Sequence, residues 1–409
     1  MTYPTITPKL TLDFANSRQL DPRITFSRSS TATRLNPDVG LITTAPSGVA
    51  RFEKEGFLIE EARTNLIQRS IDYTTYWNKY NVTIDPNVET APDGTTTASK
   101  MQWSSSSNRN MVFVQPTTDV TQTHTCSFYA KADEWNYAAV AMQPPGGGQP
   151  RYYITVDLTT GAIEEYTSGS PTQTSAVATP LPNGWWRVSA TANVNSAGKT
   201  QVQMEVGMSP NNTFGGSVSG TPDGTSGIYI WGAQEEQGSF LTSYIPTSGS
   251  TVTRAADVVE ATLPNVLNGS EGVFVTYATV QNPSINNHYI VHSEDATNTG
   301  DAVLLLASAN YSLNIYDNNT ETVRINYLAY QTGVKTVAAH AYATDNTSYI
   351  TDGVVRGTDT SCSMPSALNK LYIFANSNRP AYSLVTGHFH RLVYYDRRVS
   401  DATLETLTS

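Results

Sequence analysis

The sequence predicts an all-β protein built from two tandem antiparallel β-sandwich domains behind an extended N-terminal segment. The first observation is composition: only 15% of the 409 residues are charged, and there are 27 Gly and 21 Pro. The second is that apolar residues alternate with polar ones in short runs separated by turn formers. The third is length, because roughly 150 residues per domain predicts two to three domains.

Residues 1–68 form the N-terminal segment. Lys9–Phe14 alternates, with Leu10, Leu12 and Phe14 on one side, and is expected to be a strand. Thr25–Thr33 and Phe57–Leu66 resemble the leaders of other structural proteins, which implies that this segment attaches the protein to a larger assembly. The alternative is that its short strands complete the edges of one or both sandwiches.

Residues 69–250 are expected to form the first sandwich. Turn formers punctuate this region; in Asp157–Gly161, for example, the glycine supplies a positive φ angle. The spacing of the turns is typical of a sandwich. The expected strands are Met111–Val114, Thr123–Ala130, Tyr137–Met142, Tyr152–Asp157, Trp186–Val194, Thr200–Met208 and Ile228–Gln234.

Residues 251–258 are expected to be a linker, and residues 259–409 a second sandwich. Ser400 is a suitable N-cap for a short closing helix that contains Asp401 and Glu405. The expected strands are Gly272–Val280, His288–His292, Ala302–Leu306, Ser312–Tyr316, Glu321–Tyr327, Thr336–Ala343, Thr347–Thr351, Val354–Gly357, Lys370–Ala375 and His388–Tyr395.

Three pieces around the domain junction carry a family resemblance: Ile230–Glu236, Ser243–Thr247 and Thr253–Asp257. They resemble a junction found in many bacteriophage structural and tail-fibre proteins, where it closes a jelly roll of the carbohydrate-binding-module type. Thr25–Thr33 and Phe57–Leu66 resemble the leaders of the same proteins. The last strand, Gly387–Asp401, resembles that of a concanavalin-like (laminin-G-like) lectin jelly roll.

The resemblance implies a virion protein that is assembled in the cytoplasm of a bacterial host. Its implied partners are other virion proteins, contacted through the N-terminal segment, and a host surface glycan. It also implies a homo-oligomer, for which a trimer is plausible. Jelly rolls of this kind often hold one structural calcium ion, bound by carboxylate and backbone oxygens. Asp93, Asp223, Asp257 and Asp295 are acidic residues near turns, but they form no recognisable calcium loop.

Charge and hydropathy exclude several classes. A net charge of −10 argues against nucleic acid as a ligand, because phosphate binding needs clustered Lys and Arg. No apolar run approaches ~18 residues, so no membrane span is expected. Cys126 and Cys362 lie in different domains and do not form a disulfide framework.

Two pairs of side chains suggest chemistry. His388 and His390 lie two apart on a strand, a spacing that can present both imidazoles to a metal, although no third ligand is near in sequence. The alternative is an ordinary pair on the terminal strand. His124 and Cys126 have the same spacing, but Cys126 lies where a buried small residue is expected.

No adjacent carboxylate pair can act as acid and base on one bond, and the sequence leaves open whether carboxylates of different pairs meet in the fold. Glu60–Glu61, Glu164–Glu165 and Glu235–Glu236 are sequence neighbours, and neighbours on a strand face opposite sides. No nucleophile elbow, His-Glu-x-x-His or phosphate loop occurs. The chain is therefore expected not to be an enzyme.

Aromatic side chains are the candidate carbohydrate contacts. An exposed indole or phenol can stack on the apolar face of a sugar while its polar tip bonds a hydroxyl. The alternative role for each ring is packing in the core or at its rim. The candidates are Trp135, Tyr152, Tyr153, Trp185 and Trp186.

The sequence leaves three possible functions open. The first is a non-enzymatic tail-fibre or surface-appendage subunit that contacts host glycan. The second is a capsid decoration protein that stabilises the shell. The third is a glycan-degrading depolymerase or an esterase.

Overall fold

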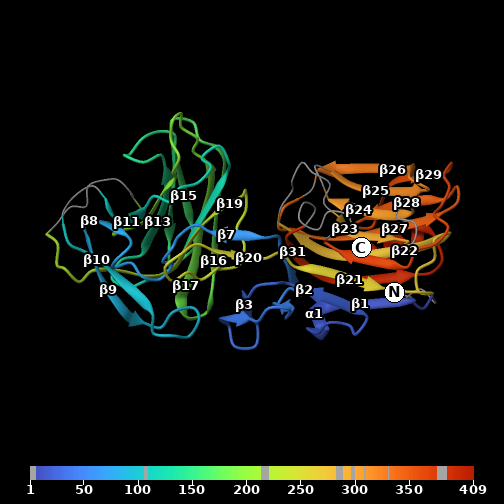
Figure 1. Cartoon of the computed structure of the whole chain (residues 1–409), viewed down its shortest axis with the longest axis horizontal. Helices are drawn as coiled ribbons and strands as arrows, with labels where there is room; N and C mark the ends of the chain where they lie inside the picture. Colours follow the sequence, from blue (N-terminus) through green and yellow to red (C-terminus); the bar gives the residue numbers. More distant parts are fainter. Residues whose placement is uncertain are drawn as a thin grey trace. The chain divides into compact units, whose positions relative to one another are not determined.

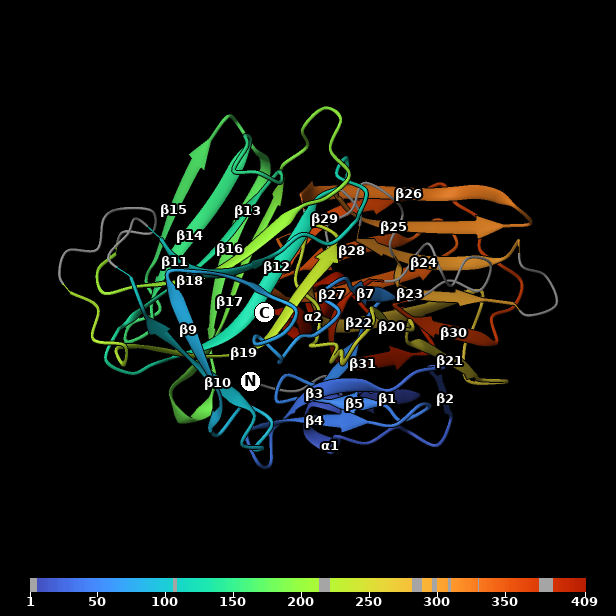
Figure 2. The same cartoon turned by 60° about the vertical axis from the view of Figure 1, so that its left-hand side comes forward.

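The computed structural model describes residues 6–105, 109–212, 221–281, 289–295, 300–307, 310–329, 331–374 and 385–409. Nearly all regular structure in these residues is β, which confirms the predicted fold class (Figures 1 and 2). The chain divides into two compact units. Unit 1 contains residues 1–31, 45–62 and 255–409, and unit 2 contains residues 32–44 and 63–254.

Unit 2 is a sandwich of two six-stranded antiparallel sheets. The first sheet has the order β16 (Thr172–Pro180), β17 (Trp185–Asn193), β12 (His124–Ala132), β19 (Gly227–Gln237), β10 (Ala98–Trp103) and β9 (Val82–Glu89). The second has the order β15 (Ile163–Ser168), β14 (Arg151–Asp157), β13 (Tyr137–Gln143), β18 (Gln203–Ser209), β11 (Asn110–Val114) and β8 (Asn78–Tyr80). Two short pairs, β3 (Ala32–Asn36) with β4 (Leu41–Ala45) and β7 (Arg63–Asn65) with β20 (Val252–Arg254), and the 3-10 turn η1 (Pro182–Gly184) complete the unit.

Alternation along the strands builds the core of unit 2. In β14, for example, Tyr152, Ile154 and Val156 are buried in the core between the sheets. A bulge in β19 shifts this alternation at Gly232, which has a φ angle of +61°. Ala233 therefore follows Ile230 into the core.

Unit 1 is a second antiparallel sandwich, with an eight-stranded and a seven-stranded sheet. The first has the order β29 (Val354–Asp359), β28 (Thr347–Thr351), β27 (Lys335–Ala343), β22 (Glu271–Val280), β31 (Gly387–Tyr395), β6 (Phe57–Ile59) and β5 (Arg51–Phe52), with β1 (Leu10–Asp13) also paired to β31. The second has the order β2 (Ile24–Ser27), β21 (Val258–Thr262), β30 (Lys370–Ile373), β23 (Tyr289–Glu294), β24 (Ala302–Ala307), β25 (Asn310–Asp317) and β26 (Thr320–Ala329). His288 and Ala375, the outer ends of two expected strands, lie outside the described residues.

Two helices belong to unit 1: α1 (Phe14–Ser17) and α2 (Asp401–Thr408). Helix α2 begins as expected, because the Ser400 side chain accepts a hydrogen bond from the Thr403 amide. Its Leu404 joins a small apolar cluster on the outer side of the eight-stranded sheet. Within the part of the chain that the structure describes, neither helix is long and apolar enough to cross a bilayer.

The N-terminal strands are part of the sheets rather than a separate body. β1 and β6 pair with β31, and β2 pairs with β21. This arrangement matches the alternative in which short strands complete sheet edges. The attachment role of residues 1–68 stays a prediction. Residues 251–258, the expected linker, contain strand β20, which pairs with β7.

Pieces of three distant motifs meet in a buried ion network of unit 1. The Asp257 carboxylate accepts from Arg28 Nη1 at 3.0 Å and from Arg51 Nη2 at 2.6 Å. Arg51 Nη1 also donates to Glu60 Oε2 at 2.6 Å. All four side chains are almost fully buried. The resemblance motifs around Arg28, Glu60 and Asp257 therefore have a structural role here.

Candidate functional site

One face of the second sheet of unit 2 points away from the core and carries polar and aromatic side chains. Alternation places them there, because their immediate neighbours on each strand fill the core. The centre of this face is buried, whereas Arg109, Arg151, Tyr153 and Tyr166 are partly exposed. We call this surface the polar face. Its members are Glu164 and Tyr166 of β15, Arg151, Tyr153 and Thr155 of β14, Ala139, Ala141 and Gln143 of β13, Gln203 and Glu205 of β18, and Met111 and Phe113 of β11.

Strand register aligns the central row of the polar face. Tyr166 lies opposite Tyr153, which lies opposite Ala141. Ala141 in turn lies opposite Glu205, and Glu205 lies opposite Phe113. Aromatic side chains thus flank a small residue and a carboxylate.

Glu205 is the centre of a hydrogen-bond network. Its Oε1 accepts from Gln143 Nε2 at 2.6 Å and from Gln203 Nε2 at 2.7 Å. Arg109 Nη1 lies 3.2 Å from Oε1, and Arg151 Nη2 lies 3.5 Å from Oε2. The carboxylate is buried, whereas the Arg109 side chain remains 24% exposed. This network fixes the direction of four planar polar groups.

Burial affects the Arg151 guanidinium. It lowers the pKa of Arg151 below its usual range, and the charge of Arg109 acts in the same direction while Glu205 opposes both. Arg151 Nε and the buried Gln143 Oε1 have no hydrogen-bond partner among the described residues. Such an atom is closed off from solvent and loses the hydrogen bonds that it would make in water, so both atoms cost stability.

A stacked tyrosine pair stands beside the network. The rings of Tyr153 and Tyr166 are nearly parallel, with centroids 4.7 Å apart and an interplanar angle of 12°. The Arg151 guanidinium lies over the Tyr153 ring, 4.6 Å from its centroid. The Tyr166 hydroxyl donates to Glu164 at 2.5 Å, and this bond raises the pKa of Tyr166 to about 12. Both rings are partly exposed.

Such an arrangement suits a polyhydroxylated ligand. Aromatic rings contact the C–H faces of a sugar ring, and planar amides and guanidinium groups bond its hydroxyls. Binding sites of this kind combine apolar surface with a few fixed polar groups.

The expected aromatic contacts are dispersed by the fold. Trp135 and Tyr152 lie in the core of unit 2, and Trp185 is buried in a smaller apolar cluster. A ring that is enclosed by protein offers no face to a sugar, so these three have a packing role. Trp186 is partly exposed but lies on β17 of the other sheet, bonded to the Leu158 carbonyl at 2.7 Å. Of the five aromatic residues expected from the sequence, Tyr153 alone lies on the polar face.

The sequence contained one signal for the residues that were missed. Gln203 and Glu205 alternate with Met204 and Val206 on β18, and polar residues at every second position of an apolar strand indicate an outer face. The sequence does not show the strand register that brings Arg109 and Arg151 to Glu205.

The His124–Cys126 pair is buried at 0% exposure. Burial raises the pKa of the Cys126 thiol well above its usual value, and the charges of Glu235 and Glu236 reinforce this effect. His124 Nδ1 lies 3.3 Å from Glu235 Oε1. A buried thiol with a raised pKa is a poor nucleophile, so the pair has no catalytic character.

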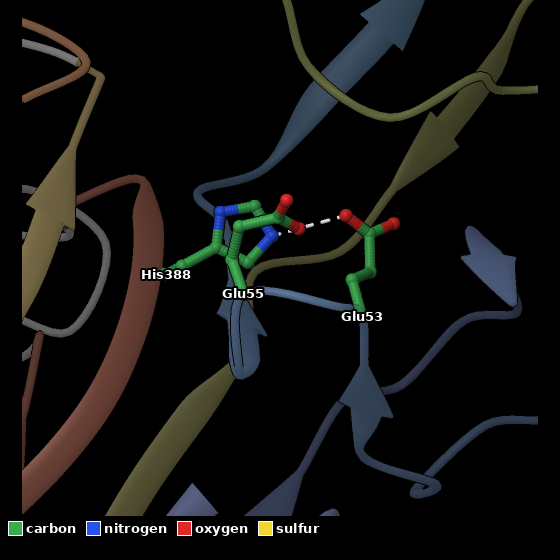
Figure 3. A group of neighbouring side chains, drawn as sticks. All are labelled: Glu53, Glu55 and His388. Atoms are coloured by element: carbon green, nitrogen blue, oxygen red, sulfur yellow. Dashed lines mark hydrogen bonds and ion pairs between the residues drawn. The ribbon is translucent and has the colours of Figure 1, made fainter. Parts of the chain in front are cut away.

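The other histidine pair separates at a bulge. β31 carries an extra residue opposite Tyr277 and Ala278 of β22, so His390 has no partner in that ladder. His390 bonds Thr279 Oγ1 through Nε2 at 2.8 Å, and its Nδ1 contacts the Glu55 carbonyl oxygen. His388 instead lies beside Glu53 and Glu55 (Figure 3). Among the described residues, the two imidazoles therefore do not share one metal site.

The aspartates near turns do not gather either. Asp93 accepts from the Thr95 amide and hydroxyl, and Asp223 from the amides of Thr225 and Ser226. Within the described residues, Glu53, Glu55 and His388 are the one group of three side chains placed to share a metal ion.

Comparisons with known proteins gave remote likenesses. No family model matches the chain. No curated protein matches it either. Among solved structures, the carbohydrate-binding module CBM40 of a Ruminococcus gnavus IT-sialidase, bound to α2,3-sialyllactose, covers 36% of this chain and 86% of its own, with 11% identity and a TM-score of 0.31.

Two other solved structures show similar values. Domain 4 of AbnA, an extracellular GH43 arabinanase of Geobacillus stearothermophilus in complex with arabinotriose, covers 41% of this chain and 81% of its own, with 11% identity and a TM-score of 0.32. A Trypanosoma rangeli sialidase in complex with sialic acid covers 76% of this chain and 60% of its own, with 10% identity and a TM-score of 0.30. At this distance, the function has to be argued from the chain's own residues.

Proposed function

We propose that the chain is a carbohydrate-binding protein whose site is the polar face of unit 2. The observation that carries this proposal is the Glu205 network next to the Tyr153–Tyr166 stack. Glu205 orients the guanidinium groups of Arg109 and Arg151, whose side chains keep 24% and 14% of their surface exposed. An array of fixed donors and acceptors beside aromatic rings is suited to sugar hydroxyls and C–H faces.

We further propose that glycan binding serves a non-enzymatic virion subunit, a tail fibre or another surface appendage. This part rests on the resemblance of the junction residues 230–257 to phage structural proteins. Weak binding at each site would be strengthened by many copies on one particle, because linked sites gain effective concentration.

The binding proposal is tested on a glycan array with the full chain. The test variants are Tyr166→Ala, on an edge strand, and Glu205→Gln, which keeps the shape of the side chain. Each variant is expected to raise the Kd for the best glycan about tenfold, which corresponds to ~1.4 kcal/mol. Tyr229→Ala is the matched control, because Tyr229 is also a partly exposed tyrosine of unit 2 with a cation, Lys100, near its ring.

Each result is decisive for one part of the proposal. Loss of binding in Tyr229→Ala alone, or no binding at all, would refute the polar face as the site. Release of shortened products from the bound glycan would instead establish the depolymerase alternative. Immunogold labelling of particles separates the remaining two roles, since label on the capsid rather than the tail would establish a decoration protein.

A further inference from the structure

A group of one imidazole and two carboxylates lies in unit 1, apart from the polar face. His388 Nε2 is 3.0 Å from Glu53 Oε2. The nearest ligand atoms of His388, Glu53 and Glu55 all lie within 4.8 Å of one another. Figure 3 shows the three side chains pointing toward a common point.

The backbone around this group is fixed by the sheet. Glu53 and Glu55 belong to the turn between β5 and β6, which is closed by the Glu53 amide bonded to the Gly56 carbonyl at 2.9 Å. β6 pairs with β31 so that Leu58 lies opposite His388. At Gly56 the turn approaches β31 so closely that a Cβ atom would lie 2.9 Å from the Phe389 carbonyl oxygen, and its φ is +137°. Only glycine allows this contact, which holds both glutamates at His388.

The donor set selects a class of metal. Imidazole nitrogen and carboxylate oxygen are both ligands of zinc at about 2.0–2.2 Å, whereas calcium and magnesium take oxygen ligands. Three ligands on a tetrahedral ion are separated by ~3.3 Å, a distance that follows from those bond lengths. The His388–Glu53 separation is already close to this value, and Glu55 is exposed and can rotate to reach it.

We propose that Glu53, Glu55 and His388 bind one divalent transition-metal ion of the zinc type. His390 does not supply a fourth ligand, because both of its nitrogens contact protein oxygens. The fourth position of the ion is therefore left to water. The bound ion would link the β5–β6 turn to β31, so metal binding is expected to stabilise unit 1.

The test uses the full chain after dialysis against a chelator, with zinc titrated by calorimetry. We expect one zinc per chain at this site and a rise in the thermal transition temperature with zinc. Glu55→Gln and His388→Gln are each expected to raise the zinc Kd by about tenfold or more, at least as much as loss of an outer-shell partner does. Because Glu55 is exposed, its variant should keep the fold, which far-UV circular dichroism verifies.

The matched control is His292→Gln. His292 Nε2 lies 3.2 Å from Glu294 Oε2, so it is a second histidine–carboxylate pair, and no third ligand joins it among the described residues. This variant should keep the zinc affinity of the wild type. Absence of zinc binding, equal affinity in Glu55→Gln and His388→Gln, or displacement of zinc by equimolar calcium would each overturn the proposal. In a crystal grown with zinc, the anomalous signal should lie at these three side chains.

Discussion

Replacing Asp257 by asparagine should destabilise unit 1 severely, because it removes the charge that two buried arginines share. Asp257 is fully buried and accepts from Arg28, from Arg51 and from the Glu60 amide at 2.9 Å. With Glu60 the network has two positive and two negative groups, so the variant leaves one uncompensated positive charge in the interior. Breaking a buried ion pair typically costs about 3–5 kcal/mol.

The assay follows from the distribution of tryptophan. All six tryptophans lie in unit 2, so fluorescence reports on that unit, whereas calorimetry detects both. For a unit of about 200 residues, 3–5 kcal/mol corresponds to a fall of roughly 6–20 °C in Tm. Asp257→Asn should lower the Tm of unit 1 by this amount and change the tryptophan transition much less.

The control for this prediction is Glu321→Gln, which breaks the exposed Arg324–Glu321 pair of the same unit. Arg324 is 55% exposed in that pair, and exposed pairs contribute about 0–1 kcal/mol. If Asp257→Asn and Glu321→Gln shift the calorimetric transition equally, the network does not stabilise unit 1 as argued.

Three further predictions concern single positions. His340 is buried without a hydrogen-bond partner among the described residues, and burial lowers its pKa well below 6.5, so the unfolded chain takes up the proton first as pH falls. The free energy of unfolding of unit 1 should therefore decrease as the pH falls below ~6.5, and His340 contributes up to ~1.4 kcal/mol per pH unit to this decrease. In His340→Phe, the free energy of unfolding measured with urea should depend less on pH between pH 7 and pH 5. Ser400→Ala should cost about 1 kcal/mol through loss of the cap on helix α2, seen as faster hydrogen exchange there. Gly161→Ala should destabilise unit 2 by about 1–3 kcal/mol in tryptophan-monitored unfolding, because its φ is +77° and the added Cβ would lie 2.4 Å from the Trp186 ring.

The strands of both sandwiches could be predicted because their alternation is local. Expected strands such as Tyr137–Met142 and Thr347–Thr351 match β13 and β28 closely. The N-cap at Ser400 was also correct, since a cap depends only on residues within one turn. β9 and β16 were missed: most of their side chains are exposed, so apolar alternation is weak.

Long-range pairing could not be read from the sequence. Nothing local shows that β1 joins β31 or that residues 51–59 form a hairpin beside His388. The same limit applied to the polar face, where Arg109 and Glu205 are far apart in the chain. Single-residue bulges, as at His390, change the direction of a side chain without any change in the surrounding pattern.

The central claim, that the polar face binds carbohydrate, is tested most directly by a crystal structure of the full chain with the tightest glycan from the array. We predict a sugar ring against the Tyr153–Tyr166 stack, with a hydroxyl at about 3 Å from the Arg109 or the Arg151 guanidinium. Glycan density beside Trp186, or anywhere in unit 1, with the polar face unchanged, would contradict the account.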